Sequence, residues 1–170
     1  MRPPIVIILA AGEGTRMKSA TPKVLHDISG RSLLGHATEA ASTIEPEHLV
    51  VVVGHESEQV VAHLDEVAPW VATVEQTQRN GTGHAVRVAL EFLTGRGVTT
   101  SEAPVVVLTG DTPLLTGESL VTMLMKHVES AAAATVLTAD LDNPFGYGRV
   151  LRSSDRVVGI VEEKDATPQQ

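Results

Sequence analysis

The sequence contains no cysteine among its 170 residues and only four aromatic side chains. Without cysteine the chain has no disulfide, thiolate nucleophile or Cys-ligated zinc, and this composition suits a reducing compartment. Few aromatic residues predict an aliphatic core. The net charge of −8, without patches that combine aromatic and basic residues, argues against nucleic-acid binding.

Long apolar runs are also lacking. No stretch approaches the length of a membrane span, and the run at residues 5–11 is too short for a signal peptide. We therefore expect a cytoplasmic protein without a membrane partner. A length of 170 residues with 42% hydrophobic residues predicts one domain, residues 1–170, with an ordinary buried core.

Apolar runs alternate with amphipathic stretches along the chain. The pattern predicts strands at 5–10, 48–54, 71–76, 103–111 and 131–140, and helices at 32–43, 57–67 (with Ser57 as cap), 83–93 and 118–130. Residues 148–152 and 156–163 predict a late β-hairpin. The fold class is α/β, a Rossmann-like, mainly parallel sheet with flanking helices, and ligands bind such sheets at the carboxyl ends of the strands.

The loop after the first predicted strand carries the clearest signal. Residues 1–31 hold five Lys/Arg against two Asp/Glu, a net charge of +3, so the remaining residues carry −11. Small residues at 10–12 and 14 let backbone amides approach a ligand, and Arg16 and Lys23 can meet phosphate oxygens. Met17 stands where a dinucleotide fingerprint needs its third glycine, and no Walker A ending follows.

Two further predicted strand ends carry polar groups. Asp111, in the turn that ends the strand predicted at 103–111, is a candidate Mg²⁺ ligand. Gln76 ends the strand predicted at 71–76, and the stretch Asn80–His84 follows it; amide and hydroxyl groups at such a strand end can read a base. His84 itself is interpreted as structural. Each feature taken alone also has a purely structural explanation. The loop after the first strand is typical of a solvated βα turn, Asp111 of a cap on the turn before Pro113, and Asn80–His84 of a plain helix start.

Together the segments LAAGEGTRM, TPKVLH, NGTGHA, LTGDTPLL, PFGYGRV and IVEEKDAT are more specific. In this order and spacing the chain resembles the amino-terminal uridylyltransferase domain of the bacterial bifunctional N-acetylglucosamine-1-phosphate uridylyltransferase/glucosamine-1-phosphate acetyltransferases. The resemblance covers essentially all residues. It implies a nucleotide-diphospho-sugar transferase fold and a Mg²⁺-dependent reaction in peptidoglycan precursor synthesis, in which UTP and N-acetylglucosamine-1-phosphate (GlcNAc-1-phosphate) give UDP-GlcNAc and pyrophosphate.

The resemblance also implies a role for each matching residue. Arg16 and Lys23 would be catalytic and meet the triphosphate, and Asp111 would hold Mg²⁺. The sugar would contact Gly148 and Glu162. The nucleotide would contact a larger set, namely Leu9, Ala10, Ala11, Gly12, Gln76, Gly81 and Thr82.

Some departures from the family pattern stand out. Glu13 replaces Lys or a neutral residue, and Asn80 replaces a leucine. The family's second metal-ligating Asn, its further sugar-binding Asn and its acetyltransferase β-helix, which builds a trimer, do not occur in these residues. The sequence is thus interpreted as a truncated, C-terminally incomplete domain, weakly active or inactive, and a monomer or weak dimer. The alternatives are another sugar-1-phosphate nucleotidyltransferase, or a nucleotide-binding module without turnover.

Overall fold

A computed structural model of the chain describes residues 2–12, 14, 17–55, 57–78, 80–154 and 156–169. The chain divides into two compact units, residues 1–126 and residues 127–170. None of the helices in the described residues is both long and apolar enough to cross a membrane.

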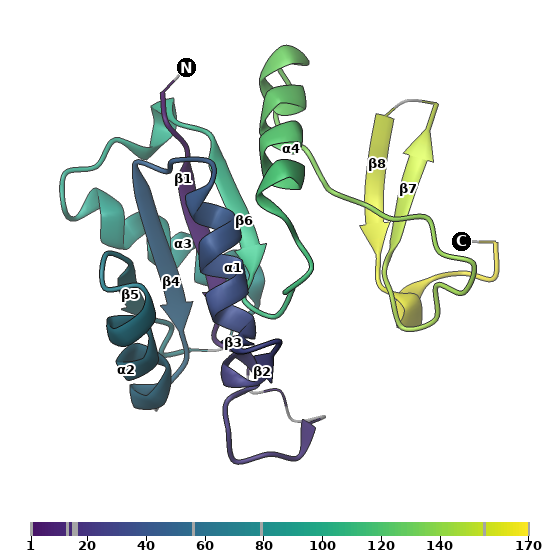
Figure 1. Cartoon of the computed structure of the whole chain (residues 1–170). Helices are drawn as coiled ribbons and strands as arrows, with labels where there is room; N and C mark the ends of the chain where they lie inside the picture. Colours follow the sequence, from purple (N-terminus) through teal and green to yellow (C-terminus); the bar gives the residue numbers. More distant parts are fainter. Residues whose placement is uncertain are drawn as a thin grey trace. The chain divides into compact units, whose positions relative to one another are not determined.

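The first unit is built on a four-stranded parallel sheet (Figure 1). Its strands, in the order β5-β4-β1-β6, are β5 (Ala72–Glu75), β4 (His48–Val53), β1 (Ile5–Ala10) and β6 (Val105–Thr109). The chain adds β4 and then β5 on one side of β1, and places β6 on the other side. The direction in which strands are added therefore reverses at β1, and ligands bind sheets of this kind at the carboxyl ends of the strands near such a point.

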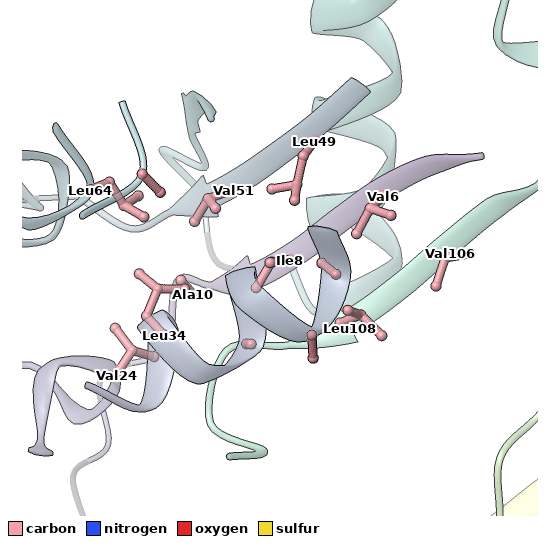
Figure 2. Packing of buried hydrophobic residues seen from close by; sticks show 14 of the residues in the cluster. Val6, Ile8, Ala10, Val24, Leu34, Leu49, Val51, Leu64, Val106 and Leu108 are labelled. Carbon is pink, nitrogen blue, oxygen red and sulfur yellow. The ribbon is translucent and has the colours of Figure 1, made fainter. Parts of the chain in front are cut away.

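Helices cover both faces of this sheet. Four of the helices are α1 (Leu33–Ser42), α2 (Glu58–Val67), α3 (Thr82–Thr94) and α4 (Gly117–Glu129). Figure 2 shows Val6, Ile8 and Ala10 of β1 within one buried cluster, which also contains residues of α1, α2 and α4. Ile5 and Ile7 belong to a second cluster, with Ala85, Ala89 and Leu93 of α3. Alternate residues of β1 thus face opposite layers, which explains its uninterrupted apolar run.

β6 lies within the strand predicted at residues 103–111, but it is buried on one face only. Val106 and Leu108 are buried, whereas Val105 and Val107 are 38% and 44% exposed. The buried pair joins the cluster of α1, α2 and α4, and the exposed pair lies on the opposite face, as the two-residue repeat of a strand requires. The α3 cluster contains no residue of β6, which accounts for this exposure.

Local signals set the helix starts and one short connection. Ser32 caps α1, because its hydroxyl accepts a hydrogen bond from the amide of Gly35. Ser57 stands at the N-cap of α2, as predicted, but its side chain makes no capping hydrogen bond. Before α1 the chain forms a 3-10 turn, Lys23–Leu25, and a two-stranded ribbon of β2 (Asp27–Ile28) and β3 (Arg31–Ser32).

The second unit contains the predicted hairpin. β7 (Arg149–Ser153) pairs antiparallel with β8 (Arg156–Val161), with an irregularity between Leu151 and Arg152, and a 3-10 turn follows at Glu163–Asp165. The strand predicted at residues 131–140 is wrong, because this segment is irregular and almost wholly exposed. Its run of alanines has weak strand propensity, and in the part of the chain that the structure describes no strand pairs with it.

Candidate functional site

A cavity of about 690 Å³ opens at the carboxyl ends of the sheet in the first unit. The end of β1 and its loop, the segment between β5 and α3, and the end of β6 each contribute to its wall. Its lining residues are Leu9, Ala10, Ala11, Gly12, Gly14, Met17, Lys23, Val24, Gln76, Gly81, Thr82, Ala85, Thr109 and Asp111. The volume is in the range of small-molecule sites, and the position includes the point at which the strand order reverses.

The two glycines of the β1 loop have different reasons to be there. Gly14 has φ +60°, and a Cβ built on it would lie 2.5 Å from Cβ of Lys23, so the fold itself requires glycine. Gly12 has no positive φ, and among the described residues no atom beyond its chain neighbours lies within 4 Å of a Cβ built there. Because Gly12 lines the cavity, its missing side chain leaves backbone exposed to whatever the cavity holds.

Lys23 reaches the cavity because its neighbour is anchored. Val24 is 5% exposed and belongs to the cluster packed between the sheet and α1, α2 and α4. The ammonium of Lys23 forms an ion pair with the carboxylate of Asp111, which comes 88 residues later in the chain. Both side chains are about one-third exposed, so the pair lies at the cavity wall and is reachable from solvent.

The turn after β6 presents Asp111 at close range to β1. The amide of Gly110 donates to the carbonyl of Leu9 over 2.9 Å, and a Cβ on Gly110 would meet that oxygen at 3.2 Å. Burial raises the pKa of Asp111, but hydrogen bonds from Lys23 and Thr109 and the charge of Lys23 outweigh it, so the net pKa is lowered. Asp111 is therefore ionised at neutral pH.

The wall formed by β5 and α3 holds a buried amide. The side chain of Gln76, 5% exposed, donates from Nε2 to the carbonyl of Gly81 over 3.2 Å. The same nitrogen lies 3.0 Å from Nδ1 of His84, on the first turn of α3. Gly81 has φ +84° at the N-cap of α3, a conformation that favours glycine. A side-chain amide and the start of a helix thus meet at one end of the cavity.

In the second unit, Gly148 and Glu162 lie across the hairpin from each other. A Cβ on Gly148 would lie 3.4 Å from the carbonyl of Val161 and 4.0 Å from Oε2 of Glu162. Two contacts hold the preceding turn to this end of the hairpin. Arg149 donates to the carbonyl of Pro144 over 3.0 Å, and Glu163 accepts from the amide of Gly146 over 2.7 Å.

The structure thus brings most of the residues singled out in the sequence to one cavity. Leu9, Ala10, Ala11, Gly12, Lys23, Gln76, Gly81, Thr82 and Asp111 all line it. Gly148 and Glu162 lie in the second unit, and Arg16 lies outside the described residues. Thr109, Val24, Met17 and Ala85 line the cavity but were not predicted to. The sequence could have indicated Thr109, since it is the last strand residue before the Gly-Asp turn. Val24 and Ala85, by contrast, are typical of core positions and give no indication of a site.

The donor set fits a divalent metal shared with a ligand. Among the described residues no three His, Asp or Glu side chains gather in a way that could hold an ion by themselves. Asp111 nevertheless presents one ionised carboxylate to the cavity. Mg²⁺ is commonly bound in this way, through one or two carboxylates together with substrate phosphates and water.

Comparison with known proteins decides the family. Residues 6–158 match the MobA-like NTP transferase domain. The chain belongs to the MobA-like NTP transferase domain family. It is also 56% identical over 172 aligned residues to the bifunctional protein GlmU of Streptomyces avermitilis, with 100% of this chain and 35% of that protein covered. The chain therefore spans about a third of the length of the curated relatives it matches.

Solved structures agree on the fold. HddC from Yersinia pseudotuberculosis superposes with a TM-score of 0.67 at 25% identity, covering 94% of this chain and 69% of that one. Rv0371c from Mycobacterium tuberculosis, described as a complex with manganese, gives a TM-score of 0.55 at 22% identity and covers 71% and 57%. The resemblance drawn from the sequence motifs is confirmed, and the chain is an NTP transferase domain of the GlmU type.

Proposed function

We propose that the domain transfers a uridylyl group from UTP to GlcNAc-1-phosphate, giving UDP-GlcNAc and pyrophosphate for peptidoglycan precursor synthesis. The observation that carries the proposal is the cavity at the strand ends. It combines a buried amide, Gln76, an open glycine backbone at Gly12, and the oppositely charged Lys23 and Asp111. These are the groups that a nucleoside triphosphate with its metal requires.

In this proposal the cavity holds the nucleotide along its length. The backbone from Leu9 to Gly12 contacts the nucleoside, and Gln76 with Gly81 and Thr82 binds the uracil. The proposal is supported by the buried position of Gln76 and by the unobstructed space at Gly12. A buried amide next to a backbone turn can discriminate between bases by its hydrogen bonds, because a wrong base leaves a buried polar group unpaired.

The transfer itself needs no protein nucleophile, in keeping with the absence of cysteine. A phosphate oxygen of GlcNAc-1-phosphate forms a bond to the α-phosphorus of UTP. The bond from that phosphorus to the bridging β-phosphate oxygen breaks, and pyrophosphate leaves with the electron pair. Lys23 and Arg16 hold the phosphates in line and stabilise the developing charge. Mg²⁺, held by Asp111 and by phosphate oxygens, would supply further charge neutralisation.

The sugar is assigned to the second unit. Gly148 permits close approach of the ligand to the backbone, and Glu162 accepts hydrogen bonds from sugar hydroxyls. This assignment is supported by the position of Gly148 and Glu162 next to each other across the hairpin. The hydrogen bonds of Arg149 and Glu163 fix the preceding turn to this end of the hairpin. A cytoplasmic location, with UTP, GlcNAc-1-phosphate and UDP-GlcNAc as small-molecule partners, completes the proposal.

Titration calorimetry with UTP, UDP-GlcNAc, CTP, GTP and dTTP, each with and without Mg²⁺, tests the base and metal assignments. We expect the uridine ligands to bind more tightly than the others, and UTP to bind more tightly when Mg²⁺ is present. Tighter binding of another nucleotide would instead identify a different sugar-1-phosphate nucleotidyltransferase.

A second assay tests the reaction. Pyrophosphate release from UTP is measured with GlcNAc-1-phosphate and, for comparison, with glucose-1-phosphate. We expect release only with Mg²⁺, and faster release with the N-acetylated sugar. Selective uridine binding without any turnover would reduce this chain to a nucleotide-binding module and refute the catalytic part of the proposal.

A further inference from the structure

The orientation of the Gln76 amide is determined by its neighbours. A backbone carbonyl can only accept a hydrogen bond, so the amide atom 3.2 Å from the Gly81 oxygen has to be nitrogen. An oxygen in that position would place two acceptors against each other. The fold therefore distinguishes the two ends of this amide, and its nitrogen faces the N-terminus of α3.

The same nitrogen of Gln76 bears on which ring nitrogen of His84 carries the proton. One amide hydrogen goes to Gly81, and the other points to Nδ1 of His84, 3.0 Å away. A nitrogen that receives this hydrogen must carry a lone pair, so this contact requires the tautomer of His84 that has its proton on Nε2. His84 and Gly81 together use both hydrogens of the amide.

One polar atom of Gln76 then remains for a ligand. In the part of the chain that the structure describes, no donor is hydrogen-bonded to Oε1. Among the described residues, Oε1 is not one of the fully buried polar atoms that lack a partner. Gln76 lines the cavity, and what it offers there is an acceptor.

We propose that His84 is a positioning residue that holds Gln76 with its carbonyl oxygen toward the base, so that the site selects a base with an N–H donor at that edge. Uracil presents such a donor at N3, whereas cytosine presents a lone pair at its N3, which Oε1 would repel. This inference rests on the proposed function, and it assigns the choice between UTP and CTP to the pair His84–Gln76.

The first test concerns the geometry and needs no ligand. NMR of the ring nitrogens of His84 in the free chain at neutral pH reports which nitrogen carries the proton. We expect a pyridine-type Nδ1 and a protonated Nε2. A proton on Nδ1 would overturn the inference whatever the nucleotide preference, because Nδ1 could then not accept from Gln76.

The second test compares the affinities for UTP and CTP in two variants. His84→Asn offers an amide oxygen near the position of Nδ1, whereas His84→Leu keeps similar bulk without an acceptor. His36→Leu is the matched control, since His36 on α1 also makes one hydrogen bond, to the carbonyl of Ile28, and does not line the cavity. A net hydrogen bond implies that His84→Leu lowers the preference for UTP over CTP by about 2- to 10-fold.

The remaining outcomes separate the inference from the function on which it rests. We expect His84→Asn and His36→Leu to keep the wild-type ratio of UTP to CTP affinity. A merely structural role of His84 would weaken both nucleotides equally in His84→Leu, and that result would overturn the inference while leaving uridine binding intact. A wild-type chain without preference for UTP over CTP would overturn the proposed function itself, and this use of Gln76 with it.

Discussion

Replacing Gly12 by alanine separates the needs of the fold from those of the ligand. Gly12 has no positive φ, and in the part of the chain that the structure describes no atom beyond its chain neighbours lies within 4 Å of an added Cβ, so the folded state accommodates the methyl group. The unfolded chain loses conformational freedom, which stabilises the protein by about 0.4–1 kcal/mol. For a chain of this length we expect Tm to rise by about 1–4 °C.

The same methyl group intrudes on the cavity. If a ligand packs against the backbone at Gly12, the added volume is an overpacking of about 1–3 kcal/mol. We therefore expect the Kd for UTP with Mg²⁺ to rise about 5- to 150-fold, measured by calorimetry. An unchanged Kd in a folded and stabilised Gly12→Ala would refute the reasoning, because it would mean that no ligand approaches this backbone.

Two further glycines serve as controls. Gly14→Ala meets both a positive φ and a Cβ contact of 2.5 Å with Lys23, so we expect a loss of about 2–5 kcal/mol and a fall in Tm of about 4–20 °C. Gly95→Ala lies in a helical conformation at the C-cap of α3 and does not line the cavity. It is expected to leave the UTP affinity unchanged.

Three other changes test separate parts of the structure. Asp111→Asn should raise the Mg²⁺ concentration that turnover requires, and an unaltered Mg²⁺ titration would contradict its role as a ligand. The pKa of Asp111 is lowered in the folded state, so its ion pair stabilises the protein fully above about pH 3.9, the ordinary pKa of an aspartate. This stabilisation is lost as the pH falls through the lower pKa of the folded state. The free energies of unfolding of the wild type and of Asp111→Asn, measured against pH, should therefore converge at low pH. Arg16→Ala should abolish turnover and leave Tm unchanged, and wild-type turnover would exclude the role. Leu34→Ala, at a fully buried position, should cost about 2–5 kcal/mol in chemical denaturation.

The sequence predicted the central strands because their burial leaves a direct mark. β1 and β4 are covered on both faces, so every position except His48 at the start of β4 is apolar and the runs are continuous. β6 carries a similar run of valines, yet its Val105 and Val107 are half exposed. A continuous apolar run therefore identifies a strand, but it does not establish that helices cover both of its faces.

The strand predicted at residues 131–140 was wrong because the segment lacks a pairing partner. A strand needs a partner to receive its backbone hydrogen bonds, and pairing is a property of the whole fold, whereas propensity is local. Alanine contributes little local preference for a strand, and the larger apolar residues of the segment stay exposed, Val136 to 49% and Leu137 to 58%. Apolar residues in a segment therefore do not predict a strand unless another strand is available to pair with it.

The sequence predicted which residues lie at the strand ends around the cavity, but not which of their side chains contact each other. Gly12, Gln76 and Asp111 each follow a predicted parallel strand, and parallel strands end at the same edge of their sheet. Strand order decides which of these ends are neighbours, and order is not written in any one segment. The pairing of Lys23 with Asp111 and the contact of His84 with Gln76 therefore became visible only in the structure.

The ion pair between Lys23 and Asp111 bears on how the proposed ligands would bind. Each charge compensates the other at a wall where both are about one-third exposed. Phosphate binding at Lys23 alone would leave Asp111 without its cation, and a metal at Asp111 alone would face the ammonium of Lys23. When both ligands bind, each charge exchanges one opposite partner for another. Within the proposed function, nucleotide and metal therefore favour each other's binding, and linkage requires this coupling to be reciprocal.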